Sequence, residues 1–284
     1  MKSLDLSSFE RPDTIRWYQE AKKQLKGKDV LDKLSWQSLG ISHLKPYYDQ
    51  ADIVDLAGQI SFFESLPHHA WELYERIEVK DSEKANAEAL QALMGGCNGI
   101  IFENSGGSDL QQLLKGIDLA ICTISTEASV EGATGMNAHN CVSISEDLNP
   151  VNQIKNILGK INNSHSWIRR RAFPDFFIEI ATVRALRFLL NQEKAGHEIK
   201  IHSSVPFHPT EEHQWFLNTT AGLASILGGS FSIDLTTAMG DNRISRNVGN
   251  ILREESGIDK YEDQCGGSFF VETVTSTIIQ EVSK

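Results

Sequence analysis

Residues 199–235 read IKIHSSVPFHPTEEHQWFLNTTAGLASILGGSFSIDL. Two short apolar runs, at 199–203 and 231–235, flank a longer segment, 210–227, whose apolar residues recur with helical spacing. Gly228 and Gly229 follow that segment, and glycine readily adopts the left-handed conformation that ends many helices. A strand, a helix and a second strand in this order are typical of a βαβ unit in a parallel sheet.

The same alternation of short apolar runs and helix-period segments extends in both directions and begins near residue 70. The predicted strands span residues 71–79, 99–102, 119–123, 141–144, 167–173, 199–203, 231–235 and 269–271. The predicted helices between them span 84–94, 108–115, 151–161, 174–194, 210–227 and 241–256. The Gly-rich crossover at 127–139 is not expected to hold a regular helix. Eight strands with intervening helices favour an α/β fold, a (β/α)8 TIM-type barrel, with a doubly wound open sheet as the alternative.

The chain length suggests one barrel with an extension. A single barrel commonly takes about 250 residues, and the chain has 284. We therefore predict an N-terminal arm at 1–69 and a compact barrel at 70–284. The arm combines a helix, from Ile15 towards Leu25, with an extended segment at 36–48.

Composition excludes several classes of protein. The net charge is −11, and such an acidic surface repels phosphate backbones, so we expect no nucleic-acid partner. No apolar run reaches the roughly 18 residues that span a bilayer, and the N-terminus MKSLDLSSFERPD lacks the apolar core of a signal peptide. The 4 cysteines are far apart and form no C-x-x-C pair. Reduced thiols in a cytoplasmic protein are the plain expectation.

Two adjacent stretches near the C-terminus carry the most specific information: RISRNVGNILREESGIDK at 243–260 and DQCGGSFFVE at 263–272. They resemble the methylmalonyl-CoA mutase family, in which an Arg-Asn helix ends in Glu-Glu-Ser/Ala-Gly and Asp-Pro-Trp-Gly-Gly-Ser with two aromatics follows. Gln264 and Cys265 stand in place of the Pro-Trp. The matching positions are Arg243, Arg246, Asn247, Glu254, Glu255, Gly257, Asp263, Gly266, Gly267, Ser268, Phe269, Phe270 and Glu272.

Further stretches resemble the same family in the same order. They are WQSLGISHLKPYY at 36–48, DFFIEIATVRALRFL at 175–189, IKIH at 199–202 and LASILGGS at 223–230. The resemblance therefore covers nearly the whole chain in patches, and it implies a TIM-type barrel.

The resemblance also implies a chemistry and a missing part. Family members isomerise acyl-CoA thioesters by a radical route in which adenosylcobalamin makes the radical and the protein positions and shields it. Family cobalamin domains carry an Asp-x-His-x-x-Gly motif, which this sequence lacks. The Thr-Met-Tyr-x-Phe-Arg-Pro-Trp-Thr segment that lines the substrate site in active large subunits has no counterpart between Tyr48 and Trp71. We therefore expect no cofactor on this chain alone, and adenosylcobalamin in the implied complex.

Candidate site residues follow from the family positions and from the predicted strand ends. His202 is the candidate catalytic residue, because the corresponding family histidine hydrogen-bonds the thioester carbonyl. In a TIM barrel, ligands bind at the carboxyl ends of the strands. The candidate substrate-binding residues are Glu103, Thr123, Ser145, Asp234 and Gln214. The histidines show no standard ligand spacing, so we predict no metal site, and we expect Arg169–Arg171 to form ion pairs.

Three functions remain open at this point. The first is a small-subunit-like pseudoenzyme that pairs with a large mutase subunit, or with a second copy of itself, and is inactive alone. The second is a catalytic acyl-CoA mutase domain, an isomerase, whose cobalamin domain is a separate chain. The third is a barrel that binds another small molecule without catalysis. An acyl-CoA is the possible ligand of the first two.

Overall fold

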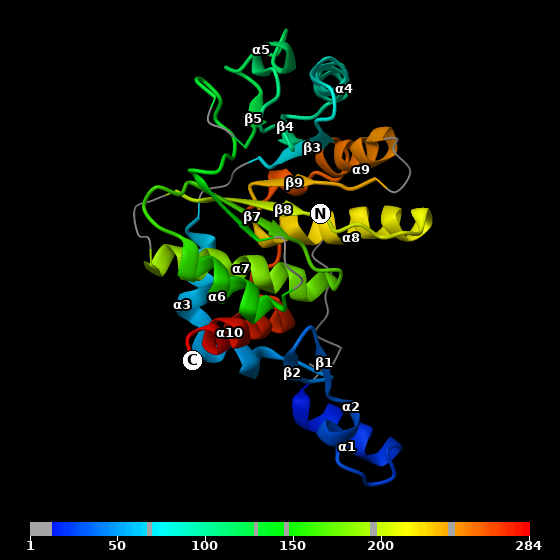
Figure 1. Ribbon diagram of the computed structural model, residues 1–284. Coiled ribbons are helices and arrows are strands. Elements are labelled where there is room, and N and C mark those ends of the chain that lie inside the picture. Colours follow the sequence, from blue (N-terminus) through cyan, green and yellow to red (C-terminus); the bar gives the residue numbers. More distant parts are fainter. Residues whose placement is uncertain (1–12, 67–69, 128–129, 145–147, 194–197, 238–241) are drawn as a thin grey trace, which may run out of the picture.

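The protein is described by a computed structural model that covers residues 13–66, 70–127, 130–144, 148–193, 198–237 and 242–284 (Figure 1). Its centre is a sheet of seven parallel strands in the order β5-β4-β3-β9-β8-β7-β6. The strands are β3 (Glu72–Glu78), β4 (Gly99–Glu103), β5 (Thr123–Ser125), β6 (Cys141–Ile144), β7 (Trp167–Arg171), β8 (Lys200–Ser204) and β9 (Ser232–Asp234).

The strand order follows the chain around a curled sheet. The last strand, β9, pairs with the first, β3, while β5 and β6 lie at the two edges. Seven of the eight predicted strands are confirmed, although the third lies a few residues later than predicted. The predicted (β/α)8 barrel is therefore confirmed only as a curled, half-barrel parallel sheet within the described residues.

The eighth predicted strand, at 269–271, is wrong, because these residues begin the helix α10 (Phe269–Val282). Val271, Val274, Thr275 and Ile278 recur at helical spacing and are buried, so the apolar face continues well past the three residues that suggested a strand. Short apolar runs do not distinguish a strand from the first turn of a buried helix.

Helices cover the convex side of the sheet (Figure 1). They are α4 (Ser82–Met94), α5 (Leu110–Leu113), α6 (Pro150–Lys160), α7 (Phe176–Glu193), α8 (Glu211–Gly228) and α9 (Asn242–Glu254). Side chains cap the starts of α4 and α6: the Asp81 side chain accepts from the backbone N–H of Lys84, and Asn149 caps α6 ahead of Pro150. As predicted, the described part of the 127–139 crossover contains no helix.

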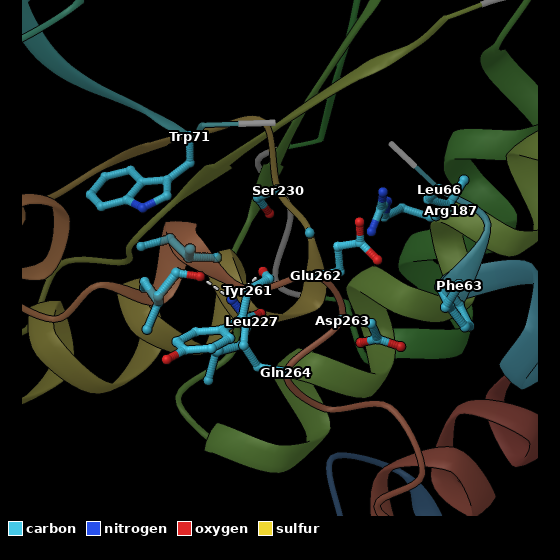
Figure 2. Close-up of a pocket in the computed structure, with 13 residues that line it drawn as sticks. Phe63, Leu66, Trp71, Arg187, Leu227, Ser230, Tyr261, Glu262, Asp263 and Gln264 are labelled. Carbon is cyan, nitrogen blue, oxygen red and sulfur yellow. Dashed lines mark hydrogen bonds between the residues drawn. The ribbon is translucent and has the colours of Figure 1, made fainter. Parts of the chain in front are cut away.

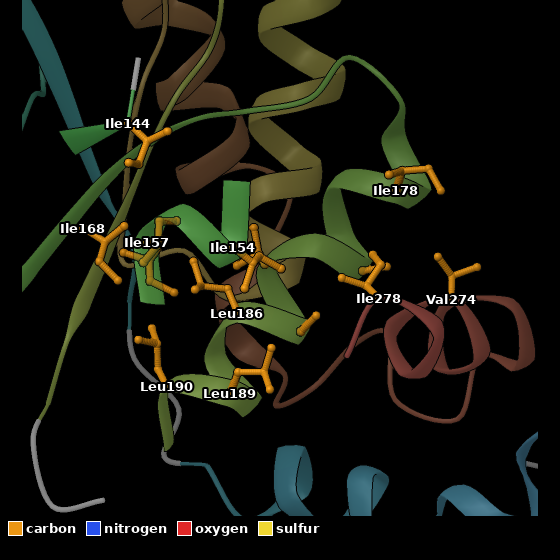
Figure 3. Packing of buried hydrophobic residues seen from close by; sticks show 14 of the residues in the cluster. Ile144, Ile154, Ile157, Ile168, Ile178, Leu186, Leu189, Leu190, Val274 and Ile278 are labelled. Carbon is orange, nitrogen blue, oxygen red and sulfur yellow. The ribbon is translucent and has the colours of Figure 1, made fainter. Parts of the chain in front are cut away.

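Two apolar clusters hold the helices to the sheet. One lies between the strands β6–β8 and the helices α6, α7 and α10, with Ile168, Leu186 and Ile278 among its buried members (Figure 3). The other lies between β3, β4 and β9 and the helices α4, α8 and α9. Because side chains alternate along a strand, the remaining residues of each strand point to the concave face.

The N-terminal segment contains α1 (Thr14–Gln24), α2 (Val30–Leu34), the antiparallel pair β1 (Trp36–Ser38) and β2 (Ile41–Leu44), the 3-10 helix η1 (Gln50–Leu56) and α3 (Ala57–Glu64). The helices α1 and α2 project from the body beside the β1–β2 pair, whereas α3 lies against α10 (Figure 1). Trp36 stacks on Phe270, with ring centroids 6.2 Å apart. The division into two parts at residue 69 stays a prediction.

Within the described residues, no helix combines the length and the apolar character needed to cross a bilayer.

A buried ion pair joins the sheet to three helices. The Arg170 guanidinium donates to both carboxylate oxygens of Glu179 at 2.6 and 2.8 Å, and both side chains are fully buried. Arg170 also donates to Gln153 of α6, and the Ser225 hydroxyl of α8 donates to Glu179. The ion pairing predicted for Arg169–Arg171 is confirmed for Arg170. A buried pair of this kind stabilises the fold only while both charges are present.

We predict that Glu179→Gln destabilises the fold by about 3–5 kcal/mol, because it leaves the buried Arg170 cation without its counter-charge. Urea denaturation followed by circular dichroism measures the change. Glu254→Gln removes an exposed partner of Arg253 and serves as the control, with an expected change of about 0–1 kcal/mol. Equal effects of the two variants would contradict a structural role for the buried pair.

Candidate functional site

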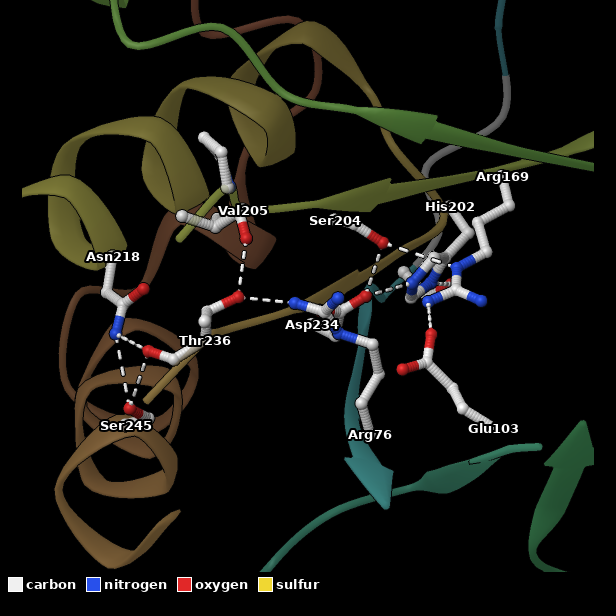
Figure 4. Close-up of polar contacts among 12 residues, drawn as sticks. Arg76, Glu103, Arg169, His202, Ser204, Val205, Asn218, Asp234, Thr236 and Ser245 are labelled. Carbon is white, nitrogen blue, oxygen red and sulfur yellow. Dashed lines mark hydrogen bonds and ion pairs between the residues drawn. The ribbon is translucent and has the colours of Figure 1, made fainter. Parts of the chain in front are cut away.

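Charged and polar side chains gather on the concave face, near the carboxyl ends of the central strands (Figure 4). Arg76 comes from β3, Arg169 from β7, His202 from β8 and Asp234 from β9. In the parallel register, Arg169 lies beside His202, and Ser204 lies beside Asp234. Side chains far apart in sequence thus meet because equivalent positions on neighbouring strands share one face.

His202 is fully buried, and both of its ring nitrogens have partners. Nε2 lies 2.7 Å from Oδ1 of Asp234, and Nδ1 lies 2.8 Å from Oγ of Ser232. Burial lowers the pKa of His202 and outweighs the Asp234 carboxylate, which raises it. The imidazole is therefore neutral near pH 7, with Nε2–H donating to Asp234 and Nδ1 accepting from the Ser232 hydroxyl.

Asp234 is the centre of this network. Its Oδ1 accepts from His202 and, at 2.5 Å, from the Ser204 hydroxyl, while its Oδ2 lies 2.6 Å from Nε of Arg76. Burial alone would raise the pKa of Asp234, but the Arg76 charge and the His202 hydrogen bond hold it well below its ordinary value. Arg76 also donates to Thr236, which follows β9 (Figure 4).

A second ion pair continues the network towards the open edge of the sheet. Arg169 Nη2 lies 2.6 Å from Oε1 of Glu103, and its Nε donates to Ser204 at 3.5 Å. The charged groups therefore cross the concave face from Glu103 on β4, through Arg169 on β7 and Asp234 on β9, to Arg76 on β3. Arg169 and Arg76 each have a carboxylate partner.

A cavity of about 460 Å³ opens beside this second pair, where the sheet is not closed. Glu103, Ser125, Met136, Ser143 and Arg169 are among its lining residues, together with Cys141. Burial raises the pKa of the Cys141 thiol to about 11, so this cysteine is not a nucleophilic thiolate at neutral pH. The cavity falls within the size range of small-molecule sites.

Aromatic and apolar side chains fill the concave face on the amino-terminal side of this network. The rings of Tyr74 and His202 lie 5.4 Å apart, and the rings of Tyr74 and Trp167 lie 6.3 Å apart. Ile101 and Met136 complete this buried cluster, and Phe231 packs against it. The centre of the curled sheet is thus occupied by side chains of the chain itself.

The structure brings three of the predicted site residues together: His202, Asp234 and, through Arg169, Glu103. Thr123 is not at a carboxyl end as expected, because it begins β5 and pairs with Gly99. Gln214 is buried on α8, where its side chain donates to Pro206 and Asn218 and so holds the loop that precedes α8. Ser145 lies outside the described residues.

Sequence reasoning missed Arg76, Ser204 and Ser232 as members of the network. Two of them carry a usable signal: Ser204 lies two positions after His202, and Ser232 lies two positions before Asp234, so each shares a strand face with a predicted residue. Arg76 has no such signal, because its partner comes from the other end of the chain and only the β3–β9 pairing brings the two together.

Metal binding has no support from side-chain placement. Among the residues that the structure describes, no three His, Cys, Asp or Glu side chains are grouped so as to hold a metal ion. The rings of His208 and His213 lie 5.0 Å apart.

A parallel sheet with a polar network at its carboxyl edge defines an α/β protein with a candidate site in the usual place. Residues 169–284, from β7 through α10, match the family model described as methylmalonyl-CoA mutase. The match covers less than half of the chain, and it shows a similarity of this C-terminal part to the family.

Other comparisons add little. No curated protein matches the chain. The solved structures that match include the (S)-3-O-geranylgeranylglyceryl phosphate synthase of Thermoplasma acidophilum in complex with sn-glycerol-1-phosphate. It has 10% identity and a TM-score of 0.37 over 79% of this chain and 98% of that chain. A likeness of that size does not establish a shared fold.

We predict that His202 makes the stability of the protein depend on pH. Because its pKa is lower in the folded state, the unfolded chain binds more protons below about pH 6.5, and the free energy of unfolding falls as the pH decreases. In His202→Asn, this slope between pH 7 and 5 should decrease by up to about 1.4 kcal/mol per pH unit. Urea denaturation at several pH values measures it. His139→Gln, at an exposed position, is the control, and an unchanged slope in His202→Asn would contradict a neutral buried imidazole.

Proposed function

We propose that this chain is a non-catalytic, small-subunit-like component of an adenosylcobalamin-dependent acyl-CoA mutase. The family match supports the class of assembly, and the state of His202 is the observation that carries the proposal. A histidine that assists acyl-CoA chemistry needs a donor free to reach the thioester carbonyl. Here the ring donates to Asp234 and accepts from Ser232.

Releasing His202 for a substrate would be costly. Its Nε2–H is one of the groups that stabilise the fully buried Asp234 carboxylate, together with Arg76 and Ser204. Removing one partner from a buried charge costs several kcal/mol, because no water replaces it. A substrate carbonyl would have to offset that loss.

In the part of the chain that the structure describes, buried side chains also occupy the centre of the concave face, along which a long acyl-CoA arm would thread. Tyr74, Trp167 and Met136 are buried in its centre and pack against one another. Phe207, which follows β8, and Trp215 on α8 are 59% and 39% exposed, so they lie outside this buried cluster. A CoA thioester threaded along the sheet would have to displace the buried cluster.

His202 does not fit the role of a cobalt ligand for cobalamin. A cobalt ligand needs an imidazole nitrogen with a free lone pair, and the ring nitrogens of His202, at the carboxyl end of the sheet, are already bonded within the protein. In the proposed complex, the cofactor and the substrate are therefore held by the large chain.

The arm offers a surface for that large chain. Leu31, Leu34 and Trp36 are exposed by 40% or more on the α1–α2 projection and the β1 strand beside it (Figure 1). Exposed apolar groups clustered on a projecting segment suit an interface with a protein partner. A large mutase subunit is the proposed partner, with a second copy of the chain as the alternative.

We predict that the purified chain binds a cobalamin-binding mutase chain from the same genome and has no mutase activity alone. Analytical ultracentrifugation of the mixture measures association, and isomerisation of methylmalonyl-CoA with adenosylcobalamin measures activity. Trp36→Ala should weaken association at least tenfold, because it truncates the largest exposed side chain of the arm. Val54→Ala, also at an exposed apolar position, is the matched control.

Two results would overturn this proposal. One is turnover by the chain with a separately supplied cobalamin domain, lost in His202→Asn, which would establish the catalytic alternative. The other is a failure of the chain to associate with the large subunit, together with binding of a small molecule in the 460 Å³ cavity that is lost in Arg169→Gln. That cavity is the observation that favours the second candidate function, a non-catalytic ligand-binding protein.

A further inference from the structure

The opposite, amino-terminal end of the sheet contains a second cavity that the proposed function does not use. It has a volume of about 230 Å³ and lies where the C-terminal part of α7 meets the start of β8. Phe62, Leu66, Leu190 and Phe231 form apolar walls, and Arg187 and Lys200 are its two cationic lining residues. A smaller cavity of about 80 Å³ adjoins it and shares Arg187, Leu66 and Gly229 (Figure 2).

We propose that this cavity binds a small amphipathic anion, an oxyanion on a short apolar body, between the Arg187 guanidinium and the Lys200 ammonium group. The site is distinct from the His202 network, and the proposal does not depend on the proposed mutase partnership.

Arg187 is a largely buried cation, and Glu262 and Asp263 line the smaller cavity beside it. Its neighbour on α7, Arg184, pairs with both Asp263 and Glu272, but Arg187 forms no ion pair or hydrogen bond among the described residues. Burial, reinforced by the Arg184 charge and opposed by Asp263, lowers the pKa of Arg187 to about 10, so it remains charged at neutral pH. Buried charges in proteins are normally paired, which makes an unpaired one a candidate for an external anion.

The backbone around Arg187 is shaped to hold the guanidinium in place. Gly229 ends α8 with a φ of +96°, and a Cβ at that position would collide with the Arg187 guanidinium. Glycine is thus required both by the left-handed backbone and by the guanidinium that packs on it. The carboxyl end of α8 gives the cation partial support through the helix dipole, without supplying a carboxylate.

Lys200 provides the second positive charge. Its Nζ lies 4.2 Å from the centre of the Phe231 ring and 5.3 Å from that of Trp167. These cation–π contacts orient the ammonium group without neutralising it. Glu198 also lines the cavity, but no ion pair joins it to Lys200 or Arg187. In a chain with 38 acidic and 27 basic residues, two cations that face one cavity and form no ion pair with a described residue are unexpected.

The lining defines the chemistry of the ligand. A guanidinium fork binds carboxylate or phosphate oxygens in a bidentate manner, and the lysine adds a point charge. The aromatic and leucine walls require an apolar portion next to the anionic group. The volume lies below the roughly 300–1,000 Å³ of drug-sized sites, so the ligand is small. Carboxylates and phosphate monoesters share this chemistry.

Isothermal titration calorimetry of the full chain tests the proposal with phenyl phosphate, benzoate, inorganic phosphate and benzyl alcohol as probes. We expect phenyl phosphate or benzoate to bind at least tenfold more tightly than inorganic phosphate, which lacks the apolar body. Benzyl alcohol, which lacks the charge, should bind no better. The ranking of phenyl phosphate and benzoate tells which oxyanion the site prefers.

Variants separate this site from surface charge. Arg187→Gln and Lys200→Gln should each reduce the affinity at least tenfold, whereas Lys80→Gln, an exposed lysine beyond the other end of β3, should leave it unchanged. If Arg187→Gln does not fold, Arg187→Lys replaces it in the titration, because this variant keeps the charge but loses the bidentate fork. The proposal is overturned if neither organic anion binds, or if the Arg187 and Lys200 variants bind as tightly as the wild-type chain. Because no mutase chain is present in the titration, its outcome is independent of the proposed function.

Discussion

The pairing of the last strand with the first is the constraint on which this structure depends. β9 lies beside β3, so residues 232–234 and 72–74 share one ladder although most of the chain separates them. The ion pair between Asp234 and Arg76 crosses that seam, and His202 and Ser204 join it from the neighbouring strand. Without this pairing, Asp234 would be a buried carboxylate with fewer partners, and the curled sheet would be two separate pieces.

The same principle, a buried charge with several partners, recurs on the convex side. Arg170 and Glu179 join β7 to α7, and Arg184 joins α7 to Glu272 of α10 and to Asp263. Arg170, Glu179, Arg184 and Glu272 each form more than one of these bonds, so each helix position is coupled to its neighbour. Arg187 is the exception on the same helix, since it is largely buried but forms no ion pair with a described residue.

The contrast between the two ends of the sheet has consequences for function. At the carboxyl end, the charges neutralise one another within the protein, and both ring nitrogens of His202 have partners. At the amino end, two cations face a cavity, and neither forms an ion pair with a described residue. Polar groups that are satisfied internally stabilise a fold, whereas groups left unsatisfied are available to a ligand.

The sequence by itself determined the alternation of strands and helices, seven of the strands, and the family resemblance that the match at 169–284 supports. These features depend on local periodicity and on short ordered motifs, which sequence records directly. Only the tertiary structure decided that 269–271 belong to a helix, that the described sheet is open between β5 and β6, and that Arg76 reaches Asp234. Those outcomes depend on which distant segments pack together, and local sequence patterns do not specify long-range contacts.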